Sequence, residues 1–158
     1  MYKIYKYFYK TNIFVCLLYA ISLTLFVNFS IVFLYTSLGF DTTNSFNNYN
    51  INLKDFLLIV VFAPFTETLL FQYTPLKIAS LFHRKKYTYC VFILISSIIF
   101  GSLHWKSTAY MIITFFYGII WSYFCLLFIR RKQHPIFFTS LIHACYNGIL
   151  ILITFLLE

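Results

Sequence analysis

Five long apolar segments dominate this sequence of 158 residues and leave it few ways to fold. They run over approximately Ile13–Thr36, Phe56–Tyr73, Tyr87–Trp105, Thr108–Ile129 and Pro135–Leu157. Each is close to the roughly 20 residues that an α-helix needs to cross a bilayer core of ~30 Å. Only 10% of the residues are charged, against roughly 25% in soluble domains. The sequence therefore predicts an all-α integral membrane protein, a bundle of about five transmembrane helices around an intramembrane polar site.

The polar stretch Ser37–Asp55 separates the first apolar segment from the others and is typical of an aqueous loop. We therefore expect an N-terminal anchor helix and polar loop over residues 1–55, followed by a single helical core over residues 56–158. The first apolar run is longer than the hydrophobic region of a signal peptide, so we interpret it as a retained anchor. The four cysteines lie in four different apolar segments without paired spacing, which is typical of reduced, buried thiols.

Two prolines should shape the second segment. Pro64 is expected to kink the helix about one turn before Glu67. Thr74-Pro75 is expected to kink it again or to end it, so that Leu76–Phe82 would lie along the membrane interface as a short amphipathic piece.

The basic residues are distributed unevenly between the two sides of the predicted bundle. With a cytoplasmic N-terminus, ten of the twelve lie on the cytoplasmic side: Lys3, Lys6, Lys10, Lys77, Arg84, Lys85, Lys86, Arg130, Arg131 and Lys132. The opposite side carries Lys54 and Lys106. This bias predicts a multi-pass protein of the cell membrane with its N-terminus in the cytoplasm and its C-terminus outside. The net charge of +8 is thus a topology signal, and the expected partner of these residues is the lipid bilayer and not nucleic acid.

Glu67 is the only charge in the run from Phe56 to Tyr73 and one of only four acidic residues in the chain. A carboxylate inside a membrane segment costs about 2.5 kcal/mol or more, so it persists mainly where it is paired or functional. Three other polar groups are embedded in apolar sequence: His104, His143 and Asn147. At 1.5 Å per helical residue their depths in the bilayer overlap with that of Glu67. We expect these four residues to form one buried catalytic site.

The residue types allow more than one chemistry. A buried glutamate can act as a general base on water near neutral pH, with a histidine orienting that water. A second histidine and an asparagine, which lie one helical turn apart at positions 143 and 147, can donate hydrogen bonds to the oxyanion of a tetrahedral intermediate. The alternative is a divalent metal such as zinc held by Glu67, His104 and His143, which would leave no second carboxylate as base. We favour the metal-free mechanism and assign no cofactor. A bis-histidine haem site would require His104 and His143 to lie at closer depths than this estimate gives.

Three short motifs follow one another on separate apolar segments: Glu67-Thr68-Leu69-Leu70-Phe71-Gln72, Phe100-x-x-x-His104 and His143-Ala144-x-x-Asn147. In this order, over about Leu57 to Leu150, they resemble the CPBP family of intramembrane endopeptidases. This family of CAAX proteases and bacteriocin-processing enzymes is also known as Abi. The resemblance implies that Glu67 and His104 activate water while His143 and Asn147 hold the oxyanion. It also implies a peptide or membrane-anchored protein as substrate.

The chain departs from the family's usual first motif, Glu-Glu-x-x-x-Arg, at two positions. Thr68 stands in place of the second glutamate and Gln72 in place of the arginine. Because the two positions are one helical turn apart, we interpret the change as the coupled replacement of a supporting ion pair by a neutral pair that can hydrogen-bond. Phe100 is the third supporting residue. The leading hypothesis is peptide processing or self-immunity by a protease, and the alternative is an inactive bacteriocin-immunity protein of the same fold that acts by binding.

Overall fold

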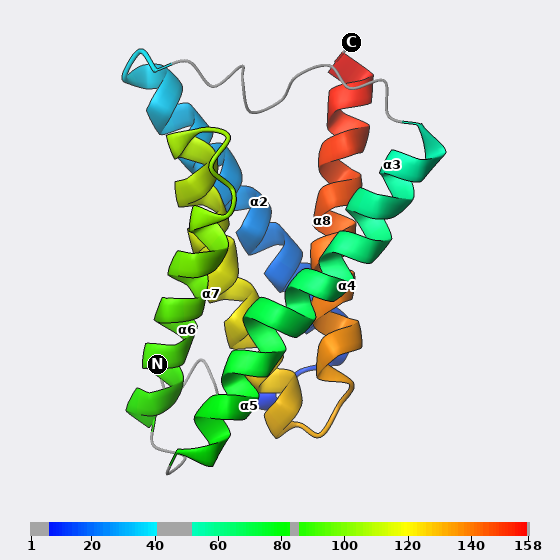
Figure 1. Cartoon of the computed structure of the whole chain (residues 1–158). Helices are drawn as coiled ribbons and strands as arrows, with labels where there is room; N and C mark the ends of the chain where they lie inside the picture. The colour runs from blue at the N-terminus through cyan, green and yellow to red at the C-terminus, as the bar shows by residue number, and fades with distance from the viewer. Residues whose placement is uncertain (1–6, 41–51, 83–85, 158) are drawn as a thin grey trace.

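The computed structural model describes residues 7–40, 52–82 and 86–157, and over these ranges the backbone is helical and contains no β-strand. Five rod-like units run in alternating directions (Figure 1). They are α2 (Ile13–Ser37), a continuous helical stretch over Leu53–Leu81, α6 (Lys86–Ser102), α7 (Thr108–Arg130) and α8 (Pro135–Leu157). The prediction of an all-α bundle is confirmed.

Four of these units are long and apolar enough to cross a membrane: α2, the stretch Leu53–Leu81, α7 and α8. The apolar part of α6, Tyr87–Ser102, is shorter. Together they account for the five predicted segments, and the chain is a multi-pass membrane protein. The predicted bounds agree with the structure within one residue for α2, α7 and α8.

The third predicted segment was too long at its C-terminal end. We expected it to reach Trp105, but α6 ends at Ser102. The His104 N–H bonds to the Gly101 carbonyl in a tighter turn, and the Ser107 hydroxyl accepts the Tyr110 N–H at 3.1 Å to start α7. His104 therefore lies in the short turn between two helices and not inside one.

The second predicted segment was too short at both ends. The helix begins at Leu53, where Asn52 caps it by accepting the Asp55 N–H at 3.0 Å. It continues through Pro75 to Leu81 as one helix of 29 residues. Leu76 and Ala79 are fully buried, so the last turns pack into the bundle and do not form a separate interfacial piece.

Two π-helical segments explain how this helix accommodates its prolines. It consists of α3 (Leu53–Leu57), η2 (Leu58–Phe62), α4 (Ala63–Glu67), η3 (Thr68–Tyr73) and α5 (Thr74–Leu81), where η marks the π-helical parts. Directly before each proline a backbone N–H bonds five residues back, from Ala63 to Leu58 and from Thr74 to Leu69. Proline cannot donate to the helix ladder, and a widened turn before it allows the helix to continue.

Glycines bring α6 and α7 into close contact. A methyl group added at Gly101 would lie 2.8 Å from the Met111 carbonyl oxygen, and one added at Gly118 would lie 2.8 Å from the Ser97 hydroxyl oxygen. Both glycines therefore serve the close helix approach that their place in apolar segments predicts. At Gly148 in α8, nothing lies within 4 Å of an added methyl group.

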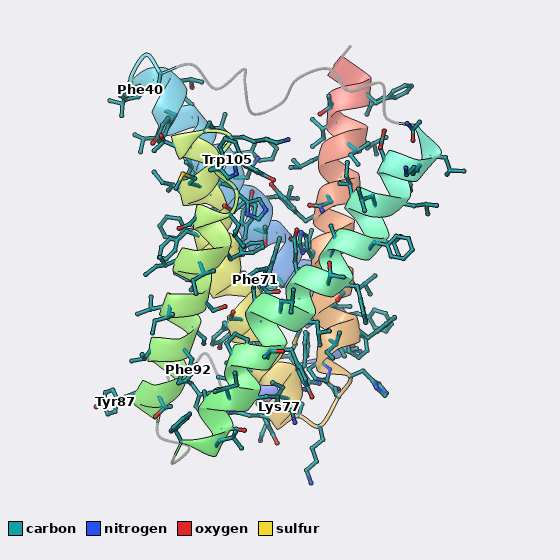
Figure 2. All side chains as sticks on the ribbon, viewed as in Figure 1. Phe40, Phe71, Lys77, Tyr87, Phe92 and Trp105 are labelled. Atoms are coloured by element: carbon teal, nitrogen blue, oxygen red, sulfur yellow. The ribbon has the colours of Figure 1, made fainter. Side chains whose placement is uncertain are left out.

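The helix ends divide between two faces of the bundle, as a five-span topology requires (Figure 1). Lys77 lies near the lower face, where α5 ends and α6 begins, and Trp105 lies near the upper face in the turn between α6 and α7 (Figure 2). Six charged residues lie outside the described part of the chain: Lys3, Lys6, Asp41, Arg84, Lys85 and Glu158. Which face is cytoplasmic stays a prediction.

Candidate active site

The structure brings Glu67 and His143 together. Glu67 is the last residue of α4, between the two π-helical segments, and His143 lies on the antiparallel α8. The His143 Nε2 and Glu67 Oε2 atoms are 3.7 Å apart. The histidine side chain is 6% exposed and the glutamate side chain 27%. An acid and an imidazole from distant parts of the sequence thus form a partly accessible polar pair inside an apolar bundle.

His104 approaches the same pair from the turn after α6. Its Nδ1 lies 2.7 Å from the Phe100 carbonyl oxygen. Because a carbonyl can only accept, Nδ1 carries the proton and Nε2 is left as an acceptor. Burial lowers the pKa of His104, the bond to Phe100 opposes this shift, and the charge of Lys106 adds to it. The ring is therefore held neutral, with Nε2 able to accept a proton.

Phe100 supports His104 with its ring as well as its carbonyl. The side chain is 1% exposed, and its ring centroid lies 4.6 Å from that of His104 in an edge-on arrangement. Phe71, which lies at mid-height in the bundle, contributes a further ring contact at 5.5 Å (Figure 2). These contacts place Phe100 directly against His104, and its supporting role stays a prediction.

Asn147 is held by a carbonyl that Pro64 leaves free. The Ala63 N–H bonds to Leu58, and the next donor in the π-helical pattern would be residue 64, which has no N–H. The Ile59 carbonyl oxygen instead accepts the Asn147 side-chain amide at 2.9 Å. This bond ties α8 to the helix of Glu67. The Asn147 amide has two hydrogens, so one remains for another acceptor.

A second interhelical bond lies near the other proline. The i+4 partner of the Phe71 carbonyl would be Pro75, and the carbonyl instead accepts the Ser96 hydroxyl of α6. Glu67 therefore lies between two interhelical bonds, one to α8 and one to α6.

Thr68 and Gln72 are both 0% exposed, so they share a buried face of the helix. We expected this neutral pair to be able to hydrogen-bond. Within the part of the chain that the structure describes, neither the Thr68 hydroxyl nor the Gln72 amide has a hydrogen-bond partner. A buried polar group left without a partner costs about 1–3 kcal/mol. Thr68 and Gln72 therefore place uncompensated polar atoms on the helix of Glu67.

Two aromatic residues at the site were not predicted. The Trp121 ring centroid lies 3.9 Å from that of His143, and the Tyr110 ring lies 5.1 Å from that of His104. Tyr110 is also within electrostatic range of Glu67. An aromatic residue in an apolar segment looks like core packing, so only the position of Tyr110, two residues into α7 after the His104 turn, offered a sequence signal.

The three candidate metal ligands, Glu67, His104 and His143, are not recorded as one group in the structure. Among the residues described, no group of three or more His, Cys, Asp or Glu side chains is arranged to hold a metal ion. Only two of the three candidates, Glu67 and His143, are within ion-pair distance. Whether the site holds a metal stays a prediction.

The protein is thus a helical membrane bundle that contains a partly accessible glutamate–histidine pair. The family model for type II CAAX prenyl endopeptidases of the Rce1-like kind matches residues 49–149. This match covers well over half of the chain, which therefore belongs to the Rce1-like CAAX endopeptidase family. No curated protein and no solved structure matches the chain significantly. The matched region contains all four predicted catalytic residues, whereas α2 lies outside it.

Proposed function

We propose that this protein is an intramembrane endopeptidase in which Glu67 activates water to hydrolyse a peptide bond. The observation that carries this proposal is the 3.7 Å separation between the Glu67 carboxylate and the His143 imidazole in a partly accessible intramembrane pair. The distance exceeds that of a direct hydrogen bond, so both groups keep bonding capacity for water and substrate. Membership of the Rce1-like family supports a protease.

The roles follow from the hydrogen-bonding state of each group. Glu67 takes a proton from water while the water oxygen bonds to the scissile carbonyl carbon, and the neutral His104 orients that water through Nε2. His143 faces a carboxylate acceptor with Nε2, which favours the proton on that nitrogen. That N–H and the second amide hydrogen of Asn147 would bind the oxyanion. When the intermediate collapses, the carbon–nitrogen bond breaks and the leaving amine takes the proton from Glu67.

The proposed substrate is a peptide or a membrane-anchored protein, and the proposed location is the cell membrane with the N-terminus in the cytoplasm. Processing of a secreted peptide, or self-immunity against one, fits an acid–histidine pair placed within the bilayer. A divalent metal such as zinc is the alternative to the glutamate base. Strong inhibition by chelators that added zinc reverses would favour it.

One observation favours a second candidate function, an inactive immunity protein that acts by binding. Thr68 and Gln72 are buried without partners where the resembled motif has an ion pair. If this difference disables catalysis, the partly accessible Glu67–His143 pair could still bind a peptide.

The decisive experiment replaces Glu67 by glutamine, which keeps the shape and cannot accept the proton. The protein in liposomes is incubated with a library of internally quenched peptides, and we expect Glu67→Gln to lower the cleavage rate by roughly 10²–10⁴-fold. Asp55→Asn is the matched control. Asp55 lies in the first turn of the same helix, where its backbone N–H bonds to the capping residue Asn52. Cleavage by Glu67→Gln at the wild-type rate would contradict the proposal, and absence of cleavage by the wild-type protein would favour the binding function.

A further inference from the structure

His143 is held in an unusual way for a functional histidine. Such a ring is commonly oriented by a hydrogen bond to its second nitrogen. Here Nε2 faces Glu67, and the buried Nδ1 has no hydrogen-bond partner among the described residues. The orientation of the ring must therefore come from packing.

That packing is supplied by Trp121 of α7. The two ring centroids are 3.9 Å apart with 31° between the planes, so the indole covers one face of the imidazole. Trp121 is 1% exposed. A rigid ring lying this close restricts rotation of the histidine about its side-chain bonds, because a turned ring would collide with the indole. The position of Trp121 thus sets the plane of His143.

Trp121 is in turn fixed by α2. Its Nε1–H donates to the Thr24 hydroxyl oxygen at 3.2 Å. The Thr24 hydroxyl donates to the Ala20 carbonyl at 2.8 Å, which fixes the direction of its lone pairs. Thr24 is 0% exposed, so no lipid or water competes for this bond.

A second connection between the same helices lies one turn away. Tyr117, four residues before Trp121, donates its hydroxyl to the Asn28 side-chain oxygen at 2.9 Å. Its ring stacks on Trp121 with centroids 5.2 Å apart and 29° between the planes. Its hydroxyl also contacts that of Tyr146, the neighbour of Asn147 in α8. Thr24 and Asn28 are spaced by one turn on α2 and meet a pair spaced by one turn on the antiparallel α7.

We propose that α2, which lies outside the matched family region, is part of the active-site framework, and that Thr24 and Asn28 are positioning residues for His143. The inference rests on the proposed function for its effect on catalysis, but its geometric part can be measured separately. Individual interhelical hydrogen bonds in membranes contribute little to stability. The larger effect of these two bonds is to orient the histidine.

The test removes the acceptor for Trp121 without changing the shape of the side chain. Thr24→Val loses the hydroxyl, and Thr24→Ser keeps it. With the peptide that the wild-type protein cleaves fastest, Thr24→Val should lower kcat by about 10- to 100-fold with little change in KM. Thr24→Ser should retain most of the wild-type kcat. Thr36→Val is the matched control, because the exposed Thr36 hydroxyl bonds only to carbonyls of its own helix.

A spectroscopic readout separates this inference from the proposed function. The chain has two tryptophans, so Trp105→Phe leaves Trp121 as the only one. In this background the stacked His143 should quench Trp121 emission, and His143→Ala should raise it. Thr24→Val should raise the emission towards the His143→Ala level, whereas Thr24→Ser and Thr36→Val should not.

The two readouts have distinct outcomes. Unchanged Trp121 emission in a folded Thr24→Val protein would overturn the inference. A changed emission in a protein whose wild-type form cleaves no peptide would uphold the positioning role and reject the proposed function. If Thr24→Val does not fold, Asn28→Leu in the same background replaces it, with the same expected rise in emission.

Discussion

The helix Leu53–Leu81 and the helix α7 differ in how much of each is buried inside the bundle. In the apolar part of α7, 56% of the residues are buried inside the bundle, whereas in the apolar part of Leu53–Leu81 only 17% are buried. The buried helix carries the scaffold of aromatic rings, and the lipid-facing helix carries Glu67 and both π-helical segments. The proposed catalytic carboxylate thus lies on the helix whose backbone is irregular, and the buried aromatic rings lie on the helix that packs against its neighbours. Substitutions in α7 should therefore affect mainly stability, and substitutions in the helix of Glu67 should affect mainly activity.

The largest expected difference is in stability. Phe124→Ala removes a ring that is 1% exposed in α7 and should lower the free energy of unfolding by about 3 kcal/mol or more. Leu70→Ala on the helix of Glu67, where the side chain is 58% exposed, should change it far less. Unfolding in mixed micelles measures both. Equal losses would mean that the two helices do not differ as described.

The next effect concerns the buried positions beside Glu67. Thr68→Glu alone and Gln72→Arg alone each bury an unpaired charge and should lower stability or activity. The double change rebuilds an ion pair across one turn and should recover part of either loss. A double-mutant cycle should give a coupling energy of about 0.5–3 kcal/mol. A double mutant no better than the sum of the singles would show that the two residues do not act as a unit.

A smaller effect is expected from the π-helical turn. Pro64→Ala restores a backbone N–H that competes with Asn147 for the Ile59 carbonyl. Losing one such bond corresponds to about 1 kcal/mol, or roughly a fivefold lower cleavage rate if Asn147 binds the oxyanion. Pro75→Ala is the control. The carbonyl four residues before it, that of Phe71, accepts a hydrogen bond from Ser96 of α6 and not from a proposed catalytic residue. A greater loss of activity in Pro75→Ala would contradict the assignment.

The smallest effect is a pH dependence. Burial lowers the pKa of His104 below its usual value of 6.5, so below that pH the unfolded chain binds a proton that the folded protein does not. Stability should therefore fall as the pH drops through this window, and His104→Gln should flatten the dependence. Melting temperatures at pH 5 to 8 measure this, with exposed His134→Gln as control. The same slope in both variants would show that His104 is not the group responsible.

The sequence predicted those features that depend on composition along a helix. The bounds of α8 follow from Pro135 and the length of the apolar run, and the meeting of Glu67 with His143 follows from the cost of leaving either polar group in lipid. The pairing could be expected because few polar groups were available to satisfy one another.

The features that were missed depend on contacts between helices. Pro75 indicated a second kink or a helix end because it lacks an N–H. Nothing in the local sequence shows that a π-helical turn and a hydrogen bond from Ser96 would compensate. Trp121 and Thr24 are individually ordinary in membrane helices. Their role becomes visible only when α2 and α7 are placed side by side.

The shortness of α6 has a consequence for the membrane itself. Its 17 residues span ~25 Å, less than the ~30 Å hydrocarbon thickness that the neighbouring helices can fill. A bilayer adapts to such hydrophobic mismatch by thinning locally. The lipid headgroups beside the turn that holds His104 would then be drawn inwards, shortening the path by which water reaches Glu67. Local thinning of the bilayer around α6 would thus supply water to the proposed hydrolytic site.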